Sequence, residues 1–214
     1  MKAPLRWFWL CAALFASAAG AQDTPDATVA AIISAVGTAI EANAVALRGG
    51  EANSVAQAII RREVAPHVDF AAITRQATGK AWQKASEVQQ TALVREFTDL
   101  MVHVLSRLLV TNQEDKLQAQ PLVLSPGATD AVVRVAVARQ RAAPAPPMLV
   151  TMRRGGAGWK MLEMRTDGVD IVQLYSANFA VVIERDGGIE GLIRALSDRN
   201  ARNAAAAAPR PVQK

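Results

Sequence analysis

The sequence has little of what catalytic and metal sites are usually built from. Its 214 residues include one cysteine, Cys11, and two histidines, His67 and His103. Serine and threonine occur without the G-x-S-x-G pattern or a comparable nucleophile context. Cys11 lies in an apolar run near the N-terminus, and without that run the chain has no disulfide, thiol nucleophile or thiolate ligand. We therefore expect no catalytic residue, no metal and no cofactor.

Long apolar runs are also scarce, and the first one is a targeting signal. Lys2 and Arg6 precede the run WFWLCAALFA, and small residues end the segment at Ala21. This order is typical of a secretory signal peptide, and the run is too short to span a membrane. We predict that residues 1–21 are removed. No later stretch approaches about 18 apolar residues, so we expect a soluble, exported protein.

The excess of positive charge is mild and local. Lysine and arginine outnumber aspartate and glutamate by 24 to 19, and removal of residues 1–21 lowers the formal charge from +5 to +3. The basic residues gather between positions 131 and 165. Nucleic acid is a poor partner for an exported chain with few aromatic residues. Anionic lipid headgroups, an acidic docking surface or an ordinary solvated sheet edge each fit this stretch.

Helical periodicity dominates the first half of the chain. Apolar residues recur at helical spacing from Thr28 to the break at Gly49-Gly50, and further helices are predicted over 51–64 and 70–78. Ser86 and Gln89 form a capping-box pattern before the longest helix, which ends near Asn112. Its apolar stripe is wide, and we expect that stripe to bury against a sheet.

The second half alternates as strands do and then returns to helical spacing. Strands are predicted over 117–124, 131–140, 147–154 and 158–165, with Pro121 marking an edge or broken strand. The last two pair through the GGAG turn as a hairpin with a long loop. Helices follow to about residue 196, and residues 201–214 are expected to be a disordered Ala-rich tail. The fold class is α+β, with residues 22–200 forming one domain whose helices cover one face of a curved, mainly antiparallel sheet.

Three polar residues have both a chemical and a structural interpretation. His67 and Asp69 are too few for a metal site, and a solvated or capping pair before a helix is the simpler interpretation. His103 is either a boundary histidine or a general base in a cavity. Glu163 shares a strand face with Trp159 in strict alternation, so it is either a buried acid or a carboxylate paired with Lys160 or an arginine.

Two stretches carry a resemblance to a known family. Residues 68–101 and 158–192 resemble MlaC-type periplasmic phospholipid-binding proteins, also called toluene-tolerance proteins. The matching positions are Asp69-Phe70, Gly79, Trp82, Ala85-Ser86, Gln89, Trp159, Glu163, Asp167-Gly168-Val169 and Gly188-Ile189-Glu190-Gly191-Leu192. Asp170 stands where the family usually has serine, and the later part of the long helix lacks a tyrosine often found there.

The resemblance implies a cone-shaped fold of the nuclear-transport-factor type around an apolar cavity. It also implies a periplasmic carrier that moves phospholipid between an outer-membrane lipoprotein complex and an inner-membrane complex with a lipid-binding ring and an ABC transporter. We expect a monomer. The alternatives are an enzyme of the same cone fold with His103 or Glu163 as base, a carrier of hopanoid-type lipid, and a docking module with a solid core.

A cavity of this kind needs aliphatic and methionine side chains, which adapt to irregular shapes. Each such residue serves a protein core equally well, and strict alternation makes Trp159 and Met161 the alternative strand face. Arg134 or Arg153 is the candidate for the lipid phosphate, and Tyr175 for a hydrogen bond near the mouth. The predicted lining is Met101, Val104, Leu108, Val133, Val135, Met148, Val150, Leu162 and Met164.

Overall fold

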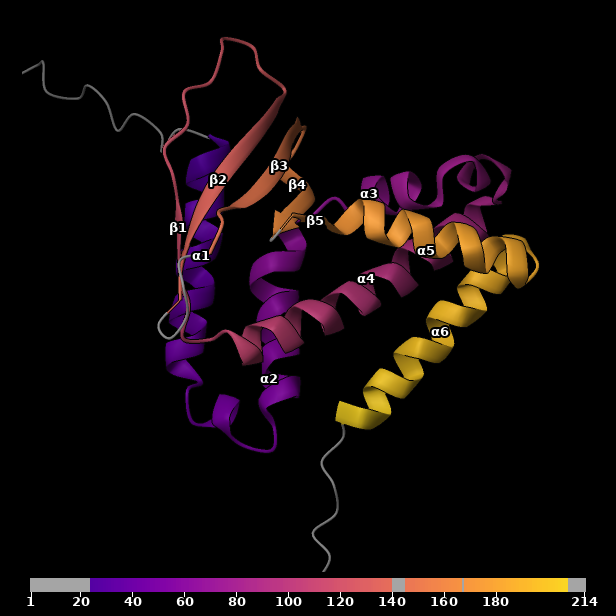
Figure 1. The fold of residues 1–214 in the computed structure, drawn as a ribbon, viewed down its shortest axis with the longest axis horizontal. Helices are drawn as coiled ribbons and strands as arrows, with labels where there is room; N and C mark the ends of the chain where they lie inside the picture. The colour runs from indigo at the N-terminus through magenta and orange to yellow at the C-terminus, as the bar shows by residue number, and fades with distance from the viewer. Residues whose placement is uncertain (1–23, 140–144, 167, 208–214) are drawn as a thin grey trace, which may run out of the picture.

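The computed structural model describes residues 24–139, 145–166 and 168–207, so the predicted signal peptide lies outside the described residues (Figure 1). Six α-helices and five strands make up this part of the chain. The helices are α1 (Pro25–Ala42), α2 (Ala52–Ile59), α3 (Phe70–Thr78), α4 (Glu87–Thr111), α5 (Ile171–Arg185) and α6 (Gly188–Ala207). The strands are β1 (Lys116–Ala119), β2 (Asp130–Ala138), β3 (Met148–Gly155), β4 (Gly158–Thr166) and β5 (Val169–Asp170).

The strands form one open antiparallel sheet in the order β1-β2-β3-β4-β5. The predicted α+β class is therefore confirmed. The edge strand β1 ends at Ala119, before Pro121, as expected for a residue that cannot donate a ladder hydrogen bond. The hairpin of β3 and β4 is tighter than predicted. Gly155 pairs with Gly158, so the turn consists of Gly156 and Ala157 alone and the predicted long loop is wrong.

A β-bulge in β4 changes which side chains share a face. Thr151 lies opposite Glu163 and Met152 lies opposite Met161, so Leu162 is an extra residue in β4. Met164 lies opposite Val150. Val150 and Met152 are two residues apart on β3 and therefore point to the same face. Met161 and Met164 therefore share one face of the sheet, and Glu163 lies on the other. The predicted strict alternation through β4 is wrong, because a single inserted residue reverses it.

One face of the sheet packs against α1. Helix α1 contacts β1 and β2, and Val29 of α1 is buried with Val133 and Val135 of β2. We call this set the sheet core: Val29, Val133, Val135, Val150, Met152 and Trp159. The opposite face carries exposed residues such as Arg134, Arg153 and Arg165. Burial on one face and charge on the other is the expected pattern for an antiparallel sheet with one solvated side.

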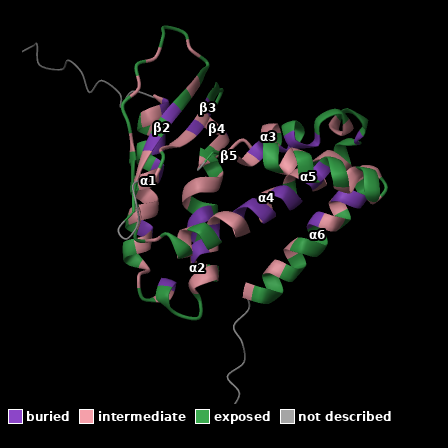
Figure 2. Cartoon of the chain, viewed as in Figure 1, coloured by how far each residue is buried: buried purple, intermediate pink, exposed green. Residues whose placement is uncertain are grey.

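The long helix α4 begins as predicted but packs differently. Ser86 accepts a hydrogen bond from the Gln89 backbone N–H at 3.2 Å, and the Gln89 side chain accepts one from the Ser86 N–H at 3.0 Å. The capping box is therefore confirmed. The apolar stripe does not bury against the sheet, because α1 already occupies the inner face there. Helix α4 packs mainly against α6 and α2, and Figure 2 shows buried residues along it.

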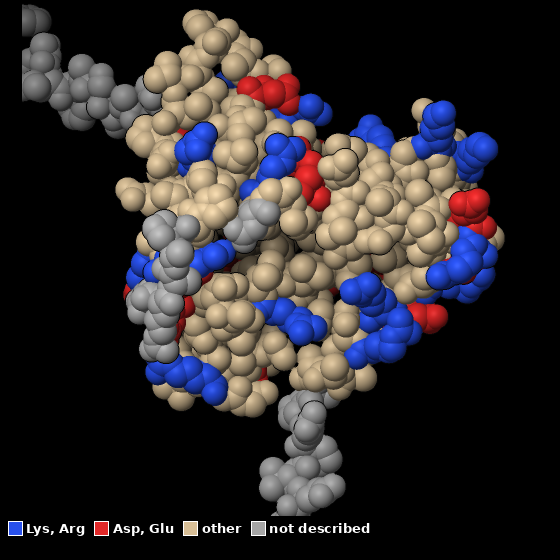
Figure 3. Space-filling view, in the orientation of Figure 1, with Lys and Arg blue, Asp and Glu red and all other residues tan. Residues whose placement is uncertain are grey.

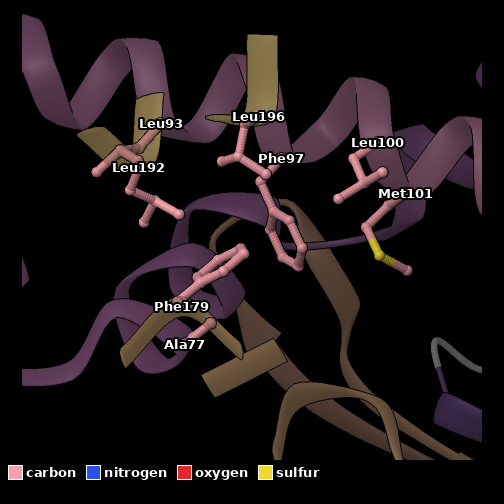
Figure 4. Close-up of a cluster of buried hydrophobic side chains, with 8 residues drawn as sticks. All are labelled: Ala77, Leu93, Phe97, Leu100, Met101, Phe179, Leu192 and Leu196. Carbon is pink, nitrogen blue, oxygen red and sulfur yellow. The ribbon is translucent and has the colours of Figure 1, made fainter. Parts of the chain in front are cut away.

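Two helical cores form around α4. The first, which we call the aromatic core, contains residues of α3, α4, α5 and α6, with Phe97 at its centre (Figure 4). Its buried members are Ala77, Leu93, Phe97, Leu100, Met101, Phe179, Leu192 and Leu196. The second, the α1–α2 core, has buried Ala39, Leu47, Ala56 and Ile59, with Leu109 and Val110 of α4 packed against it. Opposite ends of one helix thus belong to different cores.

Helix α6 is longer than the sequence predicts. It continues to Ala207, so the predicted disordered tail is corrected for residues 201–207, and residues 208–214 lie outside the described part. Alanine is the best helix former, which favours a helix through an Ala-rich run. The side chain of Asn200 also donates to the backbone oxygen and to Oε2 of Glu96 on α4, both at 2.9 Å. These bonds hold the later part of α6 against α4.

Backbone conformation and steric fit explain the glycines of the GGIEGL motif at the turn between α5 and α6. Gly187 and Gly188 have φ angles of 86° and 82°, which suit glycine. Gly191 is buried, and a Cβ there would overlap the backbone carbonyl of Asp186. Gly191 thus permits the close approach of α6 to the end of α5.

This geometry gives a stability prediction with a matched control. Gly191→Ala forces the α5–α6 turn apart, and we expect it to lower the free energy of unfolding by about 2 kcal/mol or more. Gly37→Ala lies within α1 with open space around it. The Gly37→Ala substitution lowers the conformational entropy of the unfolded chain. We expect it to raise the free energy of unfolding by about 0.5–1 kcal/mol. Urea unfolding of both variants checks this, and equal effects would contradict it.

Candidate functional site

The stretch of α4 from Val104 to Leu108 is only partly covered, and we call it the middle of α4 because it lies between the two cores that the helix serves. Before it, Leu93, Phe97, Leu100 and Met101 are buried in the aromatic core, and after it Leu109 and Val110 pack on the α1–α2 core. Between them, Val104 and Leu105 are half-buried and Leu108 is 45% exposed. An aliphatic side chain left open between two cores is available to an apolar ligand. Figure 3 shows that the surface is hollowed between the sheet and the helices α4 and α5.

The predicted lining residues divide between the cores. Val133, Val135 and Val150 are buried in the sheet core, with Met148 half-buried at its margin. Met101, Val104 and Tyr175 belong to or pack against the aromatic core. Leu162 is buried, Met164 is half-buried and Leu108 is exposed. The residues with accessible side-chain surface are therefore Val104, Leu108, Met148, Met164 and Tyr175.

Two shallow surface hollows lie away from all of these residues. One, of about 410 Å³, is bordered by Arg185, Asp186, Arg194, Asp198 and Arg202. The other, of about 440 Å³, lies beside Lys80, Lys84, Ile183 and Ile189. Both are near the turn between α5 and α6, and neither contains a predicted lipid contact. The accessible apolar residues therefore define a candidate site distinct from these hollows.

Tyr175 is held in place by two aromatic rings. Its ring centroid lies 5.0 Å from that of Phe97, at an interplanar angle of 70°, and 5.8 Å from that of Phe179. Edge-to-face contacts of this kind fix ring orientation. Burial raises the pKa of the Tyr175 hydroxyl, although the charge of Arg199 acts in the opposite direction. Within the described residues the hydroxyl has no hydrogen-bond partner, so it remains a free donor beside α4 and α6.

His103 lies on the side of α4 that faces α6. Its pKa is lowered, first by burial and then by the positive charges of Arg107 and Arg199. The imidazole is therefore neutral under ordinary conditions. The predicted boundary position is consistent with its half-buried side chain.

Glu163 takes part in a carboxylate pair at the start of α5. Arg165 Nη2 lies 3.2 Å from Glu163 Oε1 and 3.2 Å from Asp170 Oδ2. Asp170 also caps α5 by accepting from the Gln173 N–H at 2.8 Å. The pairing of Glu163 with an arginine is confirmed, and Lys160 instead donates to the Pro66 carbonyl at 2.5 Å. Among the described residues, the contacts of Glu163 and those of His103 involve different neighbours.

The carboxylate pair shifts two pKa values in opposite directions. The pKa of Glu163 is raised, first by its hydrogen bond with Asp170 and then by burial. The pKa of Asp170 is lowered, first by the same hydrogen bond, and the Gln173 N–H and Arg165 act in the same direction. Asp170 therefore keeps its charge while Glu163 retains its proton to a higher pH than usual.

The predicted headgroup arginines are unfavourably placed. Arg153 is paired with Asp130, with Nε 2.7 Å from Oδ1, and Arg134 is exposed on the outer face of the sheet. Arg154 lies over the Trp159 ring at 5.7 Å, and Arg139 lies 4.0 Å from Asp115. Most of the described basic residues between 131 and 165 thus already have partners. Carboxylates neutralise Arg139, Arg153 and Arg165 among them.

The H-x-D pair is a helix start. Asp69 Oδ1 accepts from the Ala72 N–H at 2.9 Å and caps α3. Among residues 24–139, 145–166 and 168–207, no group of three or more His, Cys, Asp or Glu side chains is placed to hold a metal ion. In the same part of the chain, no helix is long and apolar enough to cross a membrane.

Comparison with known proteins now gives the family. The family model described as "MlaC protein" matches residues 38–198. The chain belongs to the MlaC family. Among solved structures, it is similar to the phospholipid-binding protein from Ralstonia solanacearum, solved in complex with a phospholipid, with a TM-score of 0.74 and 27% sequence identity. The similarity covers 84% of this chain and 98% of that chain. A comparison with curated proteins finds no match.

Family membership puts the substitution at Asp170 in context. The resemblance described above led us to expect serine at this position, and serine also caps a helix N-terminus well. Aspartate adds a negative charge that serine lacks, and that charge reaches Glu163 and Arg165. The helix start is thus retained while the electrostatics at the β4–α5 junction differ.

Asp170→Ser therefore gives a pH prediction. A raised pKa in the folded protein means that the stability from protonated Glu163 is present at low pH and lost as pH rises through that pKa. Removing Asp170 removes the first cause of the shift, so we expect the pKa of Glu163 to fall toward its ordinary value. Titration of the Glu163 carboxyl carbon by NMR measures this. An unchanged pKa would assign the shift to burial alone.

Proposed function

We propose that this MlaC-family protein binds a phospholipid by its acyl chains and carries it through the periplasm. The observation that carries the proposal is the similarity, over nearly the whole of that chain, to a protein solved with a phospholipid bound. The predicted signal peptide agrees with this compartment. The proposal extends to phospholipid shuttling between an outer-membrane lipoprotein complex and an inner-membrane lipid-binding ring with its ABC transporter.

A carrier is needed because acyl chains are costly to expose to water. Two chains with roughly 30 methylenes cost about 24 kcal/mol at about 0.8 kcal/mol each. A protein surface that replaces water with side-chain carbon removes most of this cost. Because such a surface and a bilayer are about equally apolar, transfer between them is nearly isoenergetic. The direction of transport is then set by the membrane complexes.

The accessible apolar residues support a location for the acyl chains. Val104 and Leu108 lie on the open middle of α4, while Met148 and Met164 lie on the inner face of β3 and β4. The bulge at Leu162 places Met164 on the same face as Val150 and Met148. We place the chains between this half of the sheet and the middle of α4, where flexible methionines adapt to the ligand.

A catalytic role gains no support from the candidate bases. Glu163 is engaged by Arg165 and Thr151, with Thr151 Oγ1 3.5 Å from Glu163 Oε2. His103 lies near two guanidiniums, which disfavour the imidazolium that a general base must form. We therefore propose a binding and transport protein and not an enzyme.

Native mass spectrometry of the gently purified mature chain tests the proposal. We expect a bound species whose mass equals a phospholipid, with the headgroup identified after release. If the bound molecule is a hopanoid-type lipid, the protein is a carrier of that lipid and the phospholipid assignment is wrong. A chain that remains empty after incubation with phospholipid vesicles would contradict the carrier function.

Leu108 offers a direct test of the acyl-chain location. Leu108→Glu places a charge against the chains, and we expect retained phospholipid to fall roughly tenfold because a carboxylate is costly to bury unpaired. Leu108 is already partly exposed, so the variant folds. Val88→Glu on the same helix is the control, since Val88 is 80% exposed beside the first turn of α4. Equal lipid content in both variants would exclude the middle of α4.

A further inference from the structure

Three helices bring polar side chains, two of them arginines, to the line along which α4 packs against α6. His103 and Arg107 come from α4, Arg199 from α6, and Tyr175 from α5. The charges of Arg107 and Arg199 both reach His103, and that of Arg199 also reaches Tyr175. Helix α4 packs against α6, and Asn200 binds Glu96 one residue along α6 from Arg199. Figure 3 shows lysine and arginine side chains gathered over α6 and the adjoining part of α4. We call this set the α4–α6 groove.

The two arginines of the groove form no ion pair. Within the described residues this holds for both Arg107 and Arg199, whose side chains are exposed, and the exposed Asp198 beside Arg199 forms none either. The acids on the facing part of α4 are already engaged. Glu96 is paired with Arg95 at 2.8 Å and bound by Asn200, and Asp99 is paired with Arg61 at 2.8 Å. On the neighbouring turn, by contrast, Arg185 is neutralised by Asp186 at 2.6 Å. Two arginines against the single carboxylate of Asp198 leave the groove with a net positive charge.

The groove also borders the apolar site. Val104 packs against the aromatic core one residue from His103 and is half-buried, and the exposed Leu108 follows Arg107 directly. The ring of Tyr175 packs on Phe97, and its hydroxyl is free to donate. A ligand with apolar chains over Val104 and Leu108 would carry any attached anionic group to the arginines. This arrangement matches an amphiphile with one negative group.

We propose that Arg107 and Arg199 bind the phosphate of a phospholipid headgroup in the α4–α6 groove, with the Tyr175 hydroxyl donating a further hydrogen bond. The inference deepens the proposed function and rests on it. It replaces Arg134 and Arg153 as the headgroup residues.

The chemistry selects the phosphate and not the group attached to it. A guanidinium donates two parallel N–H bonds to phosphate oxygens, and such charge-assisted bonds are the strong ones. Every glycerophospholipid diester has one anionic phosphate, whatever its terminal alcohol. The site therefore accepts zwitterionic and anionic phospholipids alike and discriminates against lipids without phosphate. Because the His103 imidazole is neutral, it does not compete with the two arginines for the phosphate.

A pair of lipids with the same acyl chains tests this site. Dioleoyl phosphatidylglycerol and dioleoylglycerol differ in the phosphoglycerol group alone, and binding of each to the delipidated full chain is measured by competition with a fluorescent phospholipid. We expect the protein to prefer the phospholipid by roughly tenfold. Arg107→Gln with Arg199→Gln should abolish the preference and leave dioleoylglycerol binding unchanged. Arg107→Lys with Arg199→Lys keeps the charge and should keep part of the preference.

The matched control is Arg134→Gln with Arg153→Gln, which removes the same charge from the outer face of the sheet. It should keep the full preference. A preference that survives in the α4–α6 groove variant, or that is lost equally in the control, overturns the site. If the protein binds neither lipid, both the carrier function and the site fail. If it binds both lipids equally while inorganic phosphate alone shifts the His103 NMR signals, the groove is a free-anion site and the headgroup assignment is overturned.

Discussion

The fold depends on one helix serving two hydrophobic cores. Helix α4 has 25 residues and is about 37 Å long. Its first half is buried among α3, α5 and α6, and its last turn packs on α1 and α2. The sheet buries its own inner face against α1 and leaves α4 to the other helices. The described residues therefore form three separate hydrophobic cores, and two of them, the aromatic core and the α1–α2 core, are joined through α4.

Separate cores suit a protein whose ligand is itself hydrophobic. If the cores were merged, Leu108 and Met164 would be buried against other side chains. Acyl chains would then find no exposed apolar surface to contact in place of water. The cost is exposed aliphatic surface in the unloaded chain, and a lipid removes it. Stability and loading are thus coupled, since whatever binds the folded chain alone raises its stability. Lipid is in this sense part of the core that the polypeptide does not supply.

Most features that depend on residues close together in the sequence were predicted correctly. Features that depend on contacts between distant segments were not. The capping box at Ser86, the strand break before Pro121 and the helix start at Asp69 follow from residues within four positions of each other. The β-bulge depends on pairing between strands, and one added residue moved Met164 to the other face. Nothing in the sequence indicated that Asp130 pairs with Arg153 and Asp170 with Arg165. The charges of Arg107 and Arg199 both act on His103 because α6 packs on α4, and no spacing within either helix indicates this.

The placement of charge completes the argument for an oriented ligand. An apolar surface alone holds acyl chains with no preferred direction, because the hydrophobic effect is non-directional. Charged groups at one border remove that symmetry. Arg107 directly precedes the exposed Leu108 of the α4 stripe, and Arg199 lies on the helix that packs against α4. In the site that we propose, the phosphate lies at the α4–α6 groove and the chain ends point toward the sheet. Every cargo molecule would then present its headgroup at the same surface to the partner that accepts it.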